Sequence, residues 1–169
     1  MTRLEAFPPI ATPEAKILIL GSMPGAASLG AQRYYAHPHN QFWPIMASLL
    51  GFDPTLDYAS RCDRLNAAGI AVWDVLKSCN RQGSLDSAIE RDSIVVNDFS
   101  HFFTTHPKLQ EIFFNGSAAE QLFRKHVAIS ILPGRLRLQR LPSTSPAHAS
   151  LRPEAKLQHW RQALQAVRQ

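Results

Sequence analysis

The sequence predicts a three-layer α/β/α domain, in which a parallel β-sheet lies between two layers of helices. Segments 16–21 and 70–76 are continuous apolar runs, as expected of strands that are buried on both faces. Segments with helical periodicity separate the expected strands, and such crossovers join parallel strands. A chain of 169 residues, 45% hydrophobic and 18% charged, has the size and composition of a single domain, here spanning 1–169.

The first half of the chain alternates strand and helix patterns. Glycines at 51 and 69 follow the two helical segments and are typical helix stops. In chain order we expect a strand at 16–21, a loop rich in Gly, Pro and Ser over 21–40, helices over 42–50 and 57–68, a strand over 70–76, and a polar loop over 77–84.

The second half continues this alternation. Polar and apolar residues alternate strictly over 135–141, which predicts a strand near a sheet edge with one face exposed to solvent. Asn97 is the expected N-cap of a short helix. In chain order we expect a helix over 97–105, a strand over 111–114, a helix over 118–126, a strand over 135–141, a loop over 142–146, and a closing helix over 154–167.

Ligands of open parallel sheets bind outside the carboxyl ends of the strands. The loops expected to carry function are therefore 21–40, 74–84, 115–117 and 142–150. The first opens with Gly21-Ser22-Met23-Pro24-Gly25, which lacks both GxGxxG spacing and a GK[ST] sequence, so a dinucleotide or nucleoside-triphosphate site is disfavoured. Its proline suits a rigid pocket wall, and a plain tight turn is the alternative.

Segment 33–40 places two aromatic rings, two imidazoles and an amide within eight residues. A flat, hydrogen-bonding ligand such as a nucleobase needs an aromatic platform beside amide groups. Alternatively, Tyr34 or Tyr35 belongs to the core, and Asn40 is the N-cap of the next helix.

The loop that follows the last strand contains small hydroxyl residues between two prolines. Its hydroxyl and backbone N–H groups suit contacts with phosphates, and a simple polar turn is the alternative. The distribution of charge also favours contact with phosphates. Residues 120–169 hold nine Lys and Arg against two Asp and Glu, whereas residues 1–119 hold nine Lys and Arg against eleven Asp and Glu. The basic segment predicts a polyanionic partner, unless it only keeps the protein soluble.

Other classes of protein are disfavoured. No apolar run could span a bilayer and no secretory signal is visible, so we expect a cytoplasmic protein without membrane contact. Cys62 and Cys79 are too few for an iron–sulfur or four-thiolate site, and neither a metal nor a cofactor is expected.

Three segments carry a resemblance to a known family, and they are Gly21 to Gly25, Tyr34 to Trp43, and Leu141 to His148. They resemble the uracil-DNA glycosylase superfamily, and most of all its hypoxanthine-DNA (deoxyinosine) glycosylase branch, called family 6. The likeness continues through 71–76 and 114–117, so it covers nearly the whole chain. The fold of that superfamily, a four-stranded parallel sheet between helices, agrees with the fold predicted above.

The resemblance implies roles for individual residues. Asn40 occupies the catalytic position, and Tyr35 the position of the aromatic that stacks on the flipped base. Other branches carry Asp or Asn where this chain has Met23, which cannot activate water. The implied base-binding residues are Gly21, Ser22, Met23, Pro24, Gly25, Tyr35, His37, Asp74 and Asn115. For Asp74, which could accept the N1–H of hypoxanthine, a buried structural carboxylate is the alternative. The expected contacts with the DNA backbone are Ser143, Thr144, Ser145, His148, Arg140 and Arg152, with Arg135 and Arg137 adding to the attraction of phosphates.

The function expected from this resemblance is that of a monofunctional DNA glycosylase of base excision repair. Its partner would be double-stranded DNA with a damaged base, most of all deoxyinosine, and we expect a monomer without a cofactor. The alternatives are a glycosylase of the same fold for mismatched uracil or xanthine, a non-catalytic DNA-binding module, and a dinucleotide-binding enzyme.

Overall fold

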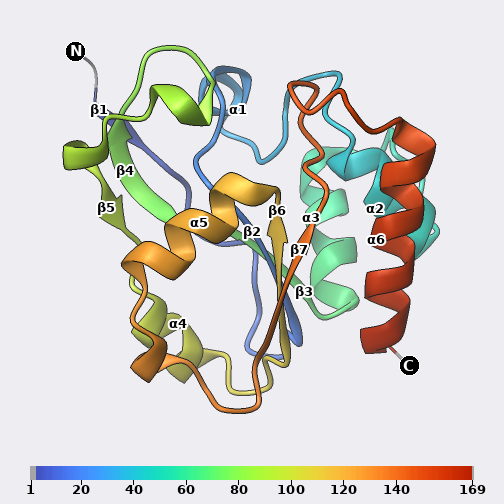
Figure 1. The fold of residues 1–169 in the computed structure, drawn as a ribbon. Helices are drawn as coiled ribbons and strands as arrows, with labels where there is room; N and C mark the ends of the chain where they lie inside the picture. The colour runs from blue at the N-terminus through green and yellow to red at the C-terminus, as the bar shows by residue number, and fades with distance from the viewer. Residues whose placement is uncertain (1–2, 169) are drawn as a thin grey trace.

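The parallel sheet forms the centre of the molecule (Figure 1). The computed structural model describes residues 3–168. The strand order is β3-β2-β6-β7, and each neighbouring pair is parallel. The strands are β2 (Ile17–Gly21), β3 (Ile70–Asp74), β6 (Glu111–Asn115) and β7 (Arg137–Leu141). The predicted four-stranded sheet is confirmed, and β7 is an edge strand as its alternating pattern indicated.

Helices cover both faces of this sheet, so the predicted three layers are confirmed (Figure 1). Alternate side chains of β2 enter two cores, with Ile17 and Ile19 in one and Leu18 and Leu20 in the other. The core that contains Ile17 and Ile19 is covered by α2 (Phe42–Leu50), α3 (Tyr58–Ala67) and α6 (Pro153–Arg168). The core that contains Leu18 and Leu20 is covered by α4 (Phe99–Thr105) and α5 (Ser117–His126).

No helix within residues 3–168 is long and apolar enough to cross a membrane.

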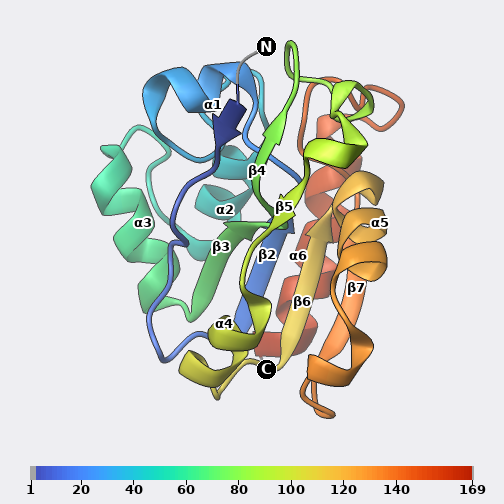
Figure 2. The same cartoon turned by 90° about the vertical axis from the view of Figure 1, so that its left-hand side faces the viewer.

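A second, antiparallel sheet was not expected. It has the order β1-β4-β5, and Figure 2 shows these strands side by side. The prediction of one strand over 70–76 followed by a polar loop is wrong, because the chain leaves the parallel sheet after Asp74 and starts β4 at once. The backbone groups of β4 pair with strands far away in the sequence, so no local sequence pattern predicts this strand. The strands are β1 (Arg3–Glu5), β4 (Leu76–Asn80) and β5 (Val95–Val96).

Two local predictions also need correction. The loop over 21–40 contains a short helix, α1 (Ala26–Ala31). Helix α4 is capped by Asp98, whose carboxylate accepts the His101 backbone N–H at 3.0 Å. The expected cap, Asn97, instead donates its side-chain amide to the Asp74 carbonyl at 2.8 Å, which anchors the end of β3.

Candidate active site

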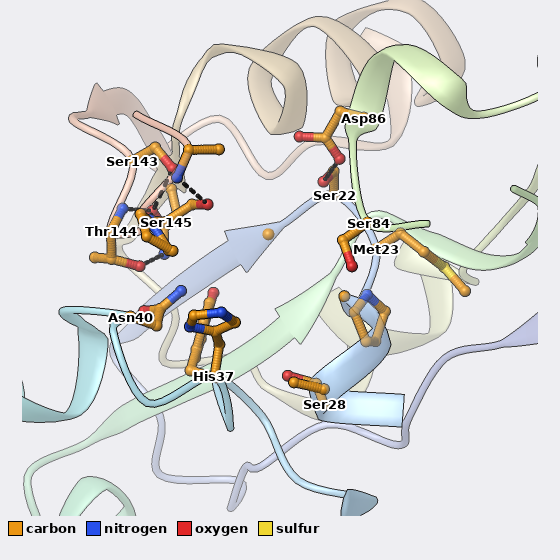
Figure 3. Close-up of a pocket in the computed structure, with 18 of the residues that line it drawn as sticks. Ser22, Met23, Ser28, His37, Asn40, Ser84, Asp86, Ser143, Thr144 and Ser145 are labelled. Atoms are coloured by element: carbon orange, nitrogen blue, oxygen red, sulfur yellow. Dashed lines mark hydrogen bonds between the residues drawn. The ribbon is translucent and has the colours of Figure 1, made fainter. Parts of the chain in front are cut away.

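A cavity of about 300 Å³ lies at the carboxyl ends of the parallel strands, where the four loops were expected to meet (Figure 3). A cavity of this size can enclose a small flat ligand. The last residues of β2, β3 and β6 and the loops that follow β2, β4 and β7 contribute to its walls. The predicted site residues that line it are Gly21, Ser22, Met23, Pro24, Gly25, Tyr35, His37, Asn40, Asp74, Asn115, Ser143, Thr144 and Ser145.

The remaining predicted residues lie outside this cavity. Arg140 and His148 line a neighbouring hollow of about 700 Å³, and Arg152 is exposed beyond both. Sequence reasoning assigned no site role to several other lining residues. Ser28, Ser84, Leu85 and Asp86, with the small residues Ala26 and Ala27, lie outside the three motif segments, and only folding brings them to the mouth. Tyr34, Pro146 and Ala147 lie within those segments but were not among the predicted site residues.

Gly21 lets the side chains of Asp74 and Tyr35 come close to the backbone at the floor of the cavity. A Cβ atom on this residue would stand 2.5 Å from Asp74 Oδ1 and 3.2 Å from the Tyr35 hydroxyl. Contacts that short require displacement of both side chains. The glycine at the end of β2 therefore lets a carboxyl and a phenol converge on one point.

Asp74, the last residue of β3, is buried, with only 4% of its surface exposed. Its Oδ2 atom is buried and has no hydrogen-bond partner. The pKa of this carboxyl is raised to about 7, mainly by burial and also by the negative charge of Asp86, while the positive charge of Arg81 opposes the shift. An unpartnered carboxyl that titrates near neutrality is expensive for stability and is typical of functional sites.

Tyr35 has a left-handed backbone conformation, with φ of 55°. Its ring stacks on Phe42 with centroids 4.2 Å apart and planes 23° apart. A base could therefore stack only on the opposite face of the ring. The hydroxyl is buried without a partner, and burial followed by the charge of Asp74 raises the pKa of this phenol, so it is a donor at neutral pH.

The Asn40 amide is held by the start of α2. Its Oδ1 atom accepts the Phe42 backbone N–H at 2.9 Å, although Gln41 is the formal N-cap residue. Within the described chain, its Nδ2 group makes no hydrogen bond, and Asn40 lines the cavity next to the loop that carries Thr144 (Figure 3). Because one lone pair of Oδ1 is engaged, Asn40 offers a ligand its Nδ2 donor and the second lone pair of Oδ1.

The loop after β7 is fixed by side chains from two other elements. The Asn115 amide accepts the Thr144 backbone N–H at 2.9 Å and donates to its hydroxyl at 3.0 Å. From α6, Trp160 donates to the Pro142 carbonyl at 2.9 Å, and Lys156 donates to the Ser145 carbonyl at 3.2 Å. The loop therefore presents its outer hydroxyls in a fixed place.

Hydroxyl groups within this loop also accept backbone hydrogen bonds. Ser143 Oγ accepts the Ser145 N–H and Ser145 Oγ accepts the Ala147 N–H, both at 3.2 Å. Their O–H donors stay available, and phosphate oxygens, which only accept, require donors.

The expected cluster of arginines is divided by the fold. Arg137 begins β7 at the opposite end of the sheet from the cavity and forms an ion pair with Glu111 at 2.9 Å. Arg135 precedes it and donates to the Leu109 carbonyl at 3.2 Å. The expectation that these two arginines join Arg140 and Arg152 on one phosphate-attracting face is therefore wrong.

The acidic side chains that line the cavity are Asp74 and Asp86. Ser22 donates its hydroxyl to Asp86 Oδ1 at 2.5 Å, which ties the first loop to the segment after β4. Met23, in the same loop, is buried. Within residues 3–168, no group of three or more His, Cys, Asp and Glu side chains is arranged to hold a metal ion.

Comparison with known proteins places this geometry in context. The family model described as "Uracil DNA glycosylase superfamily" matches residues 8–168. A hypoxanthine DNA glycosylase from Methanosarcina barkeri (strain Fusaro / DSM 804) is 38% identical over 113 residues, which are 66% of this chain and 70% of that protein. A hypoxanthine DNA glycosylase from Methanosarcina acetivorans is 39% identical over 114 residues, which are 67% and 71% of the two chains.

The fold similarity extends over the whole chain. The solution NMR structure of a candidate uracil DNA glycosylase from Methanosarcina acetivorans superposes with a TM-score of 0.80 at 30% identity. The superposition covers 99% of this chain and all of that one. The arrangement of strands around the cavity is therefore shared with that protein.

Proposed function

The chain belongs to the uracil DNA glycosylase superfamily and is a DNA glycosylase, a hydrolase of N-glycosyl bonds, and we propose that its substrate is deoxyinosine in double-stranded DNA. The extruded base, hypoxanthine, would occupy the cavity at the ends of β2 and β3. The observation that carries this proposal is the convergence of two unpartnered polar groups, on Asp74 and Tyr35, at the floor of that cavity.

Deaminated bases share one edge that fits this pair. Hypoxanthine presents an N1–H donor beside the O6 acceptor, whereas adenine presents an N1 acceptor beside an amino donor. An ionised Asp74 would accept N1–H, and the Tyr35 hydroxyl would donate to O6. In this arrangement the base meets the edge of Tyr35, which replaces the stacking on its face that the resemblance implies. With adenine in the cavity, the N1 acceptor would face the Asp74 carboxylate and the amino donor would face the Tyr35 hydroxyl. Buried groups would then be left unsatisfied, which costs about 1 to 3 kcal/mol for each group.

Catalysis would come from stabilising the departing base. The bond between N9 and C1′ breaks with its electron pair on the base, and the oxygen of a water molecule bonds to C1′. The proton that this water loses is balanced by the proton that the departing base gains. The Nδ2 donor of Asn40 suits hydrogen bonding to the negative charge that develops on the base or to the attacking water. Asn40 is neutral and cannot serve as a strong general base.

DNA would lie across the mouth of the cavity. The hydroxyls of Ser143 and Ser145 and the side chains of His148 and Arg152 lie on the side of the loop after β7. Arg140 lies on the same side and forms an ion pair with Glu120 at 3.7 Å, which a phosphate would have to share or replace. Extrusion of a base costs a few kcal/mol and is cheaper for a weakly paired lesion. A monomeric state and a cytoplasmic location remain predictions.

A base-release assay tests the substrate. Duplexes with a single deoxyinosine, deoxyuridine, deoxyxanthosine or deoxyadenosine at one position would be incubated with the protein, and the free base quantified. We expect release from deoxyinosine to be fastest and adenine to stay bound to its sugar. Faster release of uracil or xanthine would assign a different deaminated base, and release of none would leave a non-catalytic DNA-binding module.

A further inference from the structure

A further hollow lies on the outer side of the loop over 33–40. It has a volume of about 280 Å³, and Tyr35, His37 and Asn40 line both this outer hollow and the cavity, so the loop forms the wall between them. Within the described chain, the outer hollow shares no lining residue with the hollow of about 700 Å³, which adjoins the cavity at segment 84–86 and the loop after β7. The cavity is therefore flanked by hollows on two different sides.

Two arginines line the outer hollow or its rim and converge on one aromatic ring. The guanidinium carbons of Arg33 and Arg61 each lie 5.6 Å from the centroid of the Tyr58 ring. That of Arg61 also lies 4.7 Å from the centroid of the Trp43 ring. Because aromatic faces attract cations at such distances, the two rings hold two positive charges close to each other.

These two charges have no carboxylate between them. Within residues 3–168, neither Arg33 nor Arg61 forms an ion pair. The carboxylate of Asp57, one turn before Arg61, is engaged in capping α3 and accepts the Ser60 backbone N–H at 2.7 Å. Like charges that share a ring repel each other, so an anion bound between them would be stabilised by both.

The orientation of Arg61 leaves donors for a ligand. Its Nε group donates to the Leu56 carbonyl at 3.1 Å, which fixes the plane of the guanidinium group. Within the described chain, its two terminal nitrogens donate no hydrogen bond, and Arg33 is exposed with its guanidinium group equally free. Both arginines therefore present unused N–H donors beside the outer hollow.

The same two aromatic rings hold the wall of the cavity. The Tyr58 hydroxyl accepts the Tyr34 backbone N–H at 3.0 Å, and Trp43 Nε1 donates to the Tyr34 carbonyl at 2.9 Å. The backbone next to Tyr35 is thus fixed from the side of the outer hollow. An anion in this hollow would lie at a fixed place relative to the cavity.

The outer hollow lies toward the same end of the sheet as the cavity. Helix α3 ends shortly before β3 begins and runs antiparallel to it, so the first turn of α3, which carries Tyr58 and Arg61, lies toward the carboxyl ends of the strands (Figure 2). DNA that lies across the mouth of the cavity can therefore reach both arginines.

A phosphodiester is the anion that fits these groups. Guanidinium groups bind phosphate oxygens through paired N–H donors, and two of them can share one phosphate. A nucleobase fits less well, because it needs a free aromatic face and Arg61 already lies over the Trp43 ring.

We propose that Arg33 and Arg61 bind a backbone phosphate of the strand that carries the extruded nucleotide, on the side of that nucleotide away from the loop after β7. The proposal rests on the proposed function, which supplies DNA as the ligand. The strand is then held on both sides of the extruded nucleotide. The charge distribution along the sequence gave no sign of this contact, since residues 1–119 hold more acidic than basic side chains.

A scan of single phosphates tests the contact. Each phosphate near the lesion is replaced, one at a time, by an uncharged methylphosphonate, in a duplex whose deoxyinosine carries a 2′-fluorine that slows base release. We expect the affinity of the wild type to fall about tenfold at one or two positions on the side away from the loop after β7. A protein with both Arg33→Ala and Arg61→Met should bind the unmodified duplex about tenfold more weakly and lose nothing further at those positions.

The variants are chosen to keep the fold. Arg61→Met keeps an unbranched stem against Trp43, and Arg33→Ala changes an exposed side chain, so each is also measured alone. Arg64→Ala removes an exposed charge from the next turn of α3, outside the outer hollow, and is the matched control. It should change affinity by less than about twofold, whereas the double variant should lower the slope of log affinity against log salt by about 1 to 2.

Two results would overturn the phosphate contact: a double variant with the same methylphosphonate profile as the wild type, or an equal loss of affinity in Arg64→Ala. The proposed function fails separately, if wild-type protein releases no hypoxanthine from the duplex without fluorine. The scan measures binding alone, so it still decides the role of the two arginines in that case.

Discussion

The two walls of the cavity use their polar groups in opposite ways. At the ends of β2 and β3, the Asp74 carboxyl and the Tyr35 hydroxyl are buried beside Gly21 with atoms that have no partner. At the ends of β6 and β7, Asn115 and Thr144 are joined by two hydrogen bonds. Unsatisfied buried groups destabilise a fold unless a ligand meets them, so the first wall is suited to recognition and the second to holding its shape.

Asn40 both holds the start of α2 through Oδ1 and offers its Nδ2 group to a ligand. Its substitution should therefore have the largest effect on base release. Asn40→Asp keeps the acceptor for the Phe42 N–H but replaces the free donor with an oxygen. We expect base release to fall about 100-fold or more, because loss of one preorganised donor to developing charge costs that much. Single-turnover kinetics with deoxyinosine duplex would measure it.

Comparison of Asn40→Ala with Asn40→Asp separates the catalytic and structural roles of this side chain. Asn40→Ala removes the donor and also the contact with α2, so it should lose similar activity and about 1 kcal/mol of stability in addition. Near-normal turnover by Asn40→Asp would show that the free amide donor has no part in catalysis.

Asp74→Asn should move activity and stability in opposite directions. If the ionised carboxyl accepts N1–H, wild-type base release should rise with pH and level off above about 7, where Asp74 loses its proton. The variant should lose about tenfold or more in activity at pH 8 and lack this rising limb. Rates measured between pH 5.5 and 8.5 would show the limb, and Asp86→Asn, which removes a charge that raises the pKa of Asp74, should shift it to lower pH.

The same substitution has a defined effect on unfolding. Because the folded pKa of Asp74 lies above its ordinary value of 3.8, the folded protein binds this proton more tightly than the unfolded chain does. Wild-type stability contributed by this group is thus lost as pH rises from about 4 through 7. We expect the melting temperature of Asp74→Asn to exceed that of the wild type by more at pH 8 than at pH 5. A constant difference between the two would place this carboxyl in a solvated site.

Asn115→Ala should have the smallest effect on catalysis and should mainly affect the fold. The substitution leaves the buried Thr144 N–H and hydroxyl without partners, which costs about 1 to 3 kcal/mol in the free energy of unfolding. Below the melting transition we expect a loss of only a few fold in base release. Chemical denaturation and kinetics at 20 °C would measure the two quantities, and a loss as large as that of Asn40→Asp would give Asn115 a direct role in recognition.

The sequence alone predicted the parallel sheet and most helices, because buried strands and amphipathic helices leave periodic patterns within one segment. Short strands such as β4 leave none, since their stability comes from backbone pairing with distant residues. Its polar sequence looked like a loop for that reason. The boundary at Asp74 was likewise set by Asn97, a contact made across 23 positions.

The motif loops at 21–25, 33–40 and 142–148 identified which residues gather at the cavity, because the carboxyl ends of parallel strands always meet at one edge. The tertiary structure decided what each can do there. It engaged the amide of Asn115, left one donor of Asn40 free, and placed Arg137 at the far end of the sheet. It also brought Arg33 and Arg61 together at the ring of Tyr58. Sequence determines which groups are present near a site, whereas their hydrogen-bond partners come from distant segments and determine which groups remain for a ligand.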